Sequence, residues 1–143
     1  MKVDALLRHK GSFVATIRAE QSLREAVREL TARNIGALVV SPDGRVVEGI
    51  VSERDIVAQL DRTGPLVLHE DIASVMARDV QTCSPSDDMA ALMEVMTNHR
   101  IRHLPVLDDG VLAGMISIGD VVKARVDELL EDRERLHDYI NAR

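Results

Sequence analysis

The sequence Gly-Ile-Val-Ser-Glu-Arg-Asp at residues 49–55 recurs in related form as Gly-Met-Ile-Ser-Ile-Gly-Asp at residues 114–120. In each copy the apolar residues predict the end of a buried strand, and the serine predicts the N-cap of a helix. The aspartate three residues later then lies in the first turn of that helix. Such a junction brings together unpaired backbone N–H groups, a hydroxyl and a carboxylate, which together can hold a phosphate beside a ribose.

The same residues also have a purely structural interpretation. Ser-x-x-Asp approximates a capping box, and an aspartate in the first turn interacts favourably with the helix dipole without any ligand. For either copy taken alone, this structural role is the more frequent one. Choosing between the two interpretations therefore requires evidence from the rest of the sequence.

The segments around the two heptapeptides are duplicated as well. Each copy predicts a short helix, a strand, a helix, two strands joined by a glycine-containing turn, and a further helix. We assign the first repeat to residues 3–60 and the second to residues 72–126, with a connector at 61–71 and a C-terminal helical extension at 127–143. The predicted strands cover residues 13–17, 37–40, 46–51, 80–83, 104–107 and 111–116.

The length of each repeat bears on the fold. A unit of about 60 residues is marginal as an independent domain, and two copies packed face to face would bury what each leaves exposed. We therefore predict an α/β fold in which two β-α-β-β-α repeats pack as a pseudo-twofold pair. A long charged helix, from residue 120 to about residue 140, follows the second repeat.

Composition excludes several classes of function. The net charge of −6 argues against general binding to nucleic acid or anionic membranes. Phe13 and Tyr139 are the only aromatic residues, so stacking platforms for single-stranded nucleic acid are missing. The single cysteine, Cys83, excludes an internal disulfide and fits a reducing compartment. Because no apolar run approaches the roughly 18 residues of a membrane span and no signal-peptide pattern is evident, we predict a cytoplasmic location.

The duplicated unit, the two Gly-x-x-Ser-x-x-Asp sequences and the His-Leu-Pro-Val at residues 103–106 resemble a tandem pair of CBS domains, also called a Bateman module. The resemblance covers about residues 3–126, and the chain is similar to small bacterial stand-alone pairs. Such pairs commonly bind adenine nucleotides, S-adenosylmethionine or NAD(H) and regulate a partner protein. The resemblance thus implies a non-catalytic sensor whose regulatory ligand is AMP, ADP, ATP or NAD(H). The regulated protein is not identified by the sequence.

The resemblance also implies roles for individual residues. Asp55 and Asp120 would hold ribose hydroxyls, because a carboxylate can accept a hydrogen bond from both hydroxyls of a diol. Ser52 and Ser117 would face phosphate, and segments on either side would form the wall of the adenine pocket. The predicted ligand-binding residues are Thr16, Ile17, Ile35, Gly36, Ala37, Ser52, Arg54, Asp55, Thr82, Cys83, Ile101, Arg102, His103, Pro105, Ser117 and Asp120.

The two predicted sites differ in charge. The second repeat carries Arg102 and His103 where the first carries Gly36 and Ala37, and the first has Arg54 where the second has Gly119. We therefore expect different ligands. Arg102 and His103 would serve a compact phosphate such as that of AMP beside Asp120. Arg54 would serve ADP, ATP or a dinucleotide such as NAD(H) beside Asp55. In a pseudo-twofold pair both phosphate ends point inward, so a cation of one repeat can also serve the ligand of the other, and the assignment of each cation to one site stays open.

Two other functions remain open at the level of sequence. The chain could be a scaffold with vestigial nucleotide sites that self-associates through its methionine-rich helix and its terminal helix. It could also be an enzyme that processes a nucleotide, although no Ser-His-Asp or Cys-His arrangement is supported. Nucleotide binding and nucleotide turnover, respectively, distinguish these alternatives from a sensor.

Two expectations concern metals and association. His99 and His103 have the spacing of a metal-binding pair on a helix, but no third ligand is evident and no metal site is predicted. Apolar helix faces that a single chain would leave uncovered predict a homodimer. The apolar residues of these faces are Leu23, Val27, Met89 and Met93.

Overall fold

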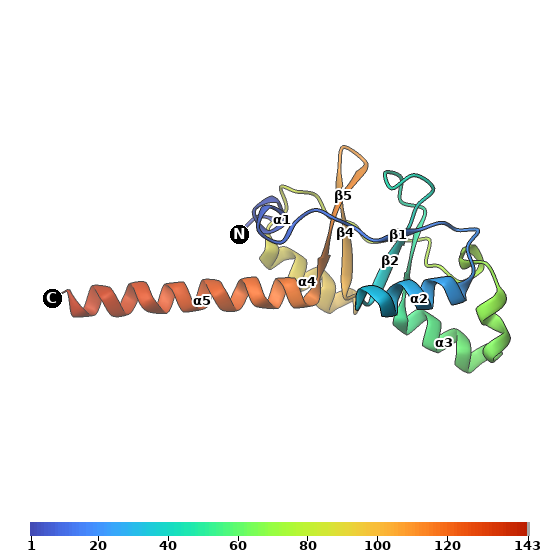
Figure 1. Ribbon diagram of the computed structural model, residues 1–143. Helices are drawn as coiled ribbons and strands as arrows, with labels where there is room; N and C mark the ends of the chain where they lie inside the picture. Colours follow the sequence, from blue (N-terminus) through green and yellow to red (C-terminus); the bar gives the residue numbers. More distant parts are fainter. Residues whose placement is uncertain (143) are drawn as a thin grey trace.

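Each repeat folds around its own small sheet in the computed structural model, which describes residues 1–142 (Figure 1). The first sheet has the order β1-β2-β3, with β1 parallel and β3 antiparallel to β2. The second sheet is the antiparallel pair β4-β5. The strands are β1 (Thr16–Ile17), β2 (Ala37–Val40), β3 (Gly49–Ser52), β4 (His103–Asp108) and β5 (Val111–Ser117). The two units form the predicted pseudo-twofold α/β pair.

Helices flank the sheets and follow the capping signals of the sequence. Ser22 caps α2 in a full capping box with Glu25, and Asn34 ends that helix in a left-handed conformation at φ 53°. The helices are α1 (Val3–Lys10), α2 (Leu23–Arg33), α3 (Glu53–Thr63), α4 (Met89–His99) and α5 (Ile118–Asn141), with short 3₁₀ turns η1 (Pro65–His69) and η2 (Ile72–Ser74).

The predicted strand at residues 80–83 is reduced to one parallel bridge, between Cys83 and Val106. Cys83 N–H donates to the carbonyl of Pro105 at 3.0 Å, and Leu107 N–H donates to the carbonyl of Cys83 at 2.8 Å. In the first repeat the corresponding ladder continues, because Val39 N–H donates to the carbonyl of Ala15. Pro105 stands at the position of Val39 and has no N–H, so the second ladder stops there.

Two predicted strands of the first repeat are shorter than expected. Residues 13–17 pair only at Thr16–Ile17, and the predicted strand at 46–51 begins at Gly49. In the second case Asp43 Oδ1 accepts hydrogen bonds from the N–H groups of Arg45 and Val46 at 2.8 and 3.0 Å. These amides are therefore held in the turn and cannot join the sheet.

Each core contains a segment that the predicted boundaries place elsewhere. Val3, Leu6 and Leu7 of α1 are buried with the second repeat, although they lie within the predicted range 3–60. Val67 of the predicted connector and Ile72 are buried with the first repeat. The chain after α1 crosses in front of the β4–β5 sheet to reach β1 in the first sheet, which explains the first exchange (Figure 1).

Helix α5 has two parts with different surroundings. Near its start Val121 and Ala124 are buried in the second core. The remainder extends away from both repeats (Figure 1) and exposes apolar side chains that include Val126, Leu129 and Leu136. Within residues 1–142 no helix combines the length and the hydrophobicity that crossing a membrane requires.

Candidate functional site

Two cavities lie at the two strand-to-helix junctions of the repeated heptapeptide. The first has a volume of about 410 Å³ and contains Ser52 and Asp55 at the junction of β3 and α3. The second has a volume of about 620 Å³ and contains Ser117 and Asp120 at the junction of β5 and α5. Both volumes fall within the range of about 300–1,000 Å³ that is usual for small-molecule sites.

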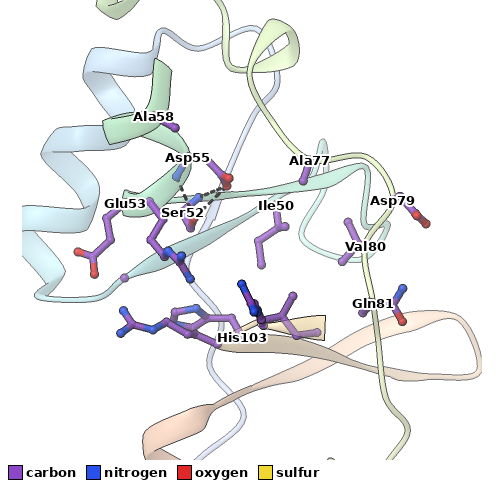
Figure 2. A pocket seen from close by; sticks show the side chains of 15 residues that line it. Ile50, Ser52, Glu53, Asp55, Ala58, Ala77, Asp79, Val80, Gln81 and His103 are labelled. Carbon is purple, nitrogen blue, oxygen red and sulfur yellow. Dashed lines mark hydrogen bonds between the residues drawn. The ribbon is translucent and has the colours of Figure 1, made fainter. Parts of the chain in front are cut away.

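Each cavity is built from both repeats. The first joins the β3–α3 junction to residues 79–81, which precede the second sheet, and to residues 100–103. The second joins the β5–α5 junction to residues 13–15 and 33–37. Figure 2 shows this for the first cavity, where His103 lies across from Ser52 and Asp55. A ligand in either cavity would therefore contact both halves of the molecule.

The aspartate of each junction caps its own helix. Ser52 donates to Asp55 Oδ2 through both its N–H (3.0 Å) and its hydroxyl (2.9 Å), and Asp55 N–H donates to Ser52 Oγ (3.3 Å) (Figure 2). Ser117 and Asp120 repeat the exchange of backbone bonds at 2.9 and 3.1 Å. Within the described residues, Oδ1 of neither aspartate accepts a hydrogen bond, so capping leaves one carboxylate oxygen available to a ligand.

Three arginines line the first cavity, namely Arg54, Arg100 and Arg102. Within residues 1–142 none of their guanidinium groups forms an ion pair or a hydrogen bond, so all three are available to an anion. The sequence assigned Arg102 to the ligand beside Asp120. The structure places Arg102 in the other cavity instead, because the residues that lead into β4 line the cavity of Asp55. Of residues 100–103, only His103 also lines the second cavity.

The second cavity has two cations that the sequence did not single out. Lys10 Nζ lies 2.6 Å from Asp120 Oδ2 and donates to the carbonyl of Met115 at 2.8 Å. Partial burial acts to raise the pKa of Asp120, but the hydrogen bonds from Lys10 and Ser117 outweigh it and the pKa lies below its usual value. Arg33 also lines this cavity and stacks over Phe13, with 5.3 Å between its guanidinium carbon and the ring centroid.

His103 separates the two cavities beside Gly36. A Cβ atom added to Gly36 would lie only 3.2 Å from Cε1 of His103, so a larger residue there would require the ring to shift by a few tenths of an ångström. Burial lowers the pKa of His103 below its usual value of 6.5, and the charge of Arg102 acts in the same direction, against the opposing effect of Glu53. The ring is therefore predominantly neutral at pH 7 and offers hydrogen bonds rather than the positive charge assigned to it from the sequence.

Several predicted site residues line neither of these cavities. Ile17 and Cys83 are buried in the two cores, and Pro105 is buried in β4. Residues 13–15, which precede Ile17, and residues 79–81, which precede Cys83, line the cavities instead. Burial raises the pKa of the Cys83 thiol to about 12, so it remains protonated and unreactive. Thr16 and Thr82 also lie outside both linings. The predicted residues that do line a cavity are Ile35, Gly36, Ala37, Ser52, Arg54, Asp55, Ile101, Arg102, His103, Ser117 and Asp120.

Comparison with known proteins identifies the repeat. The model of the CBS domain family matches residues 12–62 and 70–127. The mitochondrial CBS domain-containing protein CBSX3 of Arabidopsis thaliana is 36% identical over 125 residues, which are 85% of this chain and 61% of the length of that protein. The crystal structure of the CBS-domain containing protein ATU1752 from Agrobacterium tumefaciens is 43% identical, with a TM-score of 0.84 over 87% of this chain and 99% of the other.

A more distant structure contains ligands. The CBS domain pair of protein MJ0100, in complex with 5′-methylthioadenosine and S-adenosyl-L-methionine, has a TM-score of 0.78 and is 22% identical. The match covers 90% of this chain and 98% of that one. At this identity the likeness concerns the fold.

Proposed function

The chain belongs to the CBS domain family as a tandem pair, and from this premise we propose that it is a regulatory module whose two cavities bind adenine nucleotides. The proposal is based mainly on one observation. Each repeat presents an aspartate that caps a helix through Oδ2 and leaves Oδ1 without a hydrogen bond to the described residues, inside a cavity of suitable volume.

The chemistry of the cavities supports a nucleotide. The open carboxylate oxygen can accept from a ribose diol, and the arginines of the first cavity can pair with phosphate oxygens. The adenosine compounds bound to MJ0100 support the choice of the adenosine class. Because Arg54, Arg100 and Arg102 all line the first cavity, we assign ADP, ATP or a dinucleotide such as NAD(H) to it and AMP to the second.

We further propose that the module acts without catalysis. A ligand that touches both repeats can favour one relative packing of the two over another, and a partner protein can bind one of these states preferentially. The buried, protonated thiol of Cys83 offers no nucleophile. The net charge of −6 supports the expectation that nucleic acid and anionic membranes are not partners. We also propose a cytoplasmic location, because a single cysteine fits a reducing compartment.

Equilibrium dialysis tests this function. We expect AMP and ATP to bind, and GMP and GTP to bind at least about tenfold more weakly. In the double variant Asp55→Ala/Asp120→Ala both cavities should lose roughly ten- to a hundredfold in affinity, because each ribose loses a charged acceptor worth about 1.5–3 kcal/mol.

The alternatives give different results in the same assay. Equal binding of guanine and adenine nucleotides, or unchanged binding by the double variant, would refute the proposal. A scaffold with vestigial sites would bind none of them, and an enzyme would convert the bound nucleotide. Native mass spectrometry of freshly purified protein provides a separate check through any nucleotide that co-purifies.

We also propose a homodimer, through a different surface from the one predicted. Leu23 and Met89 are buried within the chain at 0% and 4% exposure, so the predicted helix faces are already covered in part. The exposed stripe lies instead on α5. Along α5, positions 126, 129, 133, 136 and 140 follow the alternating three- and four-residue spacing of a coiled coil. Four of them carry exposed apolar residues, namely Val126, Leu129, Leu136 and Ile140, and the fifth is Arg133.

Light scattering at tens of micromolar checks the dimer. We expect twice the chain mass of 15.8 kDa for the wild type. Leu129→Glu should give a monomer because it places a charge in the seam of the two helices. Leu66→Glu is the control, since Leu66 is an exposed leucine of η1, remote from α5, and this variant should remain dimeric. A monomeric wild type would contradict the proposal.

A further inference from the structure

Helix α1 places a cation directly against one of the two ribose-binding candidates. Lys10, the last residue of α1, pairs with Asp120 at 2.6 Å, and the two side chains are 33% and 24% exposed. Asp55, the equivalent aspartate, accepts hydrogen bonds from Ser52 and from no other residue among 1–142. The equivalent aspartates of the two cavities therefore have different partners, because only Asp120 pairs with a lysine.

The difference is built into the duplication. By the spacing that relates Thr16 to Thr82, the residue of the second repeat that corresponds to Lys10 is Met76. Met76 is buried and packs against Gly49, so it brings no charge to the first cavity. A lysine at this position is thus specific to the second cavity.

Lys10 is held in place by the helix that carries it. The methyl groups of Leu7 lie so close to Gly114 that a Cβ atom there would be 2.7 Å away. At the other end of α1, the N-terminal ammonium of Met1 pairs with Glu128 of α5 at 3.1 Å. These contacts fix α1 on the second repeat, so the ammonium of Lys10 belongs to the wall of the cavity.

This pairing changes what Asp120 can select. A ribose that approaches Asp120 meets a carboxylate whose charge Lys10 already compensates, so a neutral nucleoside gains less from it. The Lys10 ammonium has three donors, of which two are used by Asp120 and Met115. A ligand with an anion next to its ribose offers the third donor a charge-assisted hydrogen bond.

We propose that Lys10 makes the second cavity selective for ribosyl ligands that carry an anionic group and makes it discriminate against neutral nucleosides. The inference rests on the proposed function of that cavity. It concerns the preference between ligands, not whether the cavity binds nucleotides at all.

Calorimetric titration of AMP and adenosine, in an Asp55→Ala background that weakens the first cavity, tests the proposal. Relative to that background, Lys10→Met should lower the preference for AMP over adenosine by roughly ten- to a hundredfold. Lys10→Arg keeps the cation and should retain most of the preference. Lys2→Met is the matched control, because Lys2 precedes α1, lines neither cavity and should change nothing.

Two contrary outcomes have different meanings. If AMP binds and Lys10→Met leaves the preference unchanged, the inference is overturned while the proposed function stands. If AMP does not bind even with Lys10 and both aspartates intact, the proposed function fails and the inference fails with it. NMR titration verifies that the variant acts at this pair, since the pKa of Asp120 should rise in a folded Lys10→Met protein and remain low in Lys10→Arg.

Discussion

Gly49→Ala is expected to lower the free energy of unfolding by about 2–4 kcal/mol, through steric overlap and the hydrogen bonds that overlap would disturb. A Cβ atom at Gly49 would lie 2.8 Å from the carbonyl oxygen of Ala77 and 2.7 Å from the sulfur of Met76. The Ala77 backbone cannot retreat easily, because it exchanges two hydrogen bonds with Ile50 at 3.0 and 2.9 Å. Urea denaturation of the variant and the wild type measures the effect.

Two other glycines provide graded controls. A Cβ atom at Gly114 would meet the flexible end of Leu7, so Gly114→Ala should cost less than Gly49→Ala. Gly119 lies in the first turn of α5 and a Cβ atom there would have only an ordinary contact, 3.6 Å from Ser117 Oγ. Gly119→Ala should therefore be neutral or stabilise by up to about 1 kcal/mol. Equal effects at Gly49 and Gly119 would contradict this account of the junction.

Single substitutions at the two aspartates are expected to separate two ligands. Asp55→Ala should weaken ATP binding roughly ten- to a hundredfold and spare most of the AMP binding, and Asp120→Ala should do the reverse. Each alanine also removes the aspartate half of a capping box while the serine N-cap remains, at a cost of up to about 1 kcal/mol in stability. The corresponding asparagine variants keep an acceptor for the cap, and they separate loss of affinity from loss of stability. Calorimetry with both nucleotides on all four variants is the measurement.

Substitution of Arg102 tests which of the two cavities its charge serves. The sequence placed its charge beside AMP and Asp120, whereas the structure places it in the cavity of Asp55 with Arg54 and Arg100. Arg102→Met should therefore weaken ATP binding and leave AMP binding largely unchanged. Arg28 lies on α2 outside both cavities, and Arg28→Met serves as the matched control. Two identical, independent AMP sites would refute the difference between the cavities.

Features that depend on near neighbours in the chain were predictable from the sequence alone. The capping boxes at Ser52 and Ser117 span three residues, and the structure contains both. The strands β2, β4 and β5 agree with the predicted apolar runs to within one residue at each end. The duplication itself made the paired α/β architecture predictable, because a unit of about 60 residues is marginal as an independent domain.

Pro105 is a case in which the signal was present but its consequence was missed. Proline has no N–H wherever it stands, so a central strand that contains it cannot complete a ladder on the side to which that N–H would point. The sequence therefore contained the reason that residues 80–83 do not form a full strand. Which side of β4 Pro105 faces depends on the neighbouring segment, and only the folded chain shows that its partner would have been Gln81.

Contacts between distant residues were decided by the tertiary structure alone. Lys10 and Asp120 are separated by 110 positions, and no local pattern links them. They meet because α1 packs into the core of the second repeat and leaves its last residue at the β5–α5 junction. In the same way, Arg102 lines the same cavity as Asp55 because the residues leading into one sheet run past the strand-to-helix junction of the other. Helix caps and apolar runs are properties of a few adjacent residues, whereas the composition of each cavity depends on how the chain crosses between the two repeats.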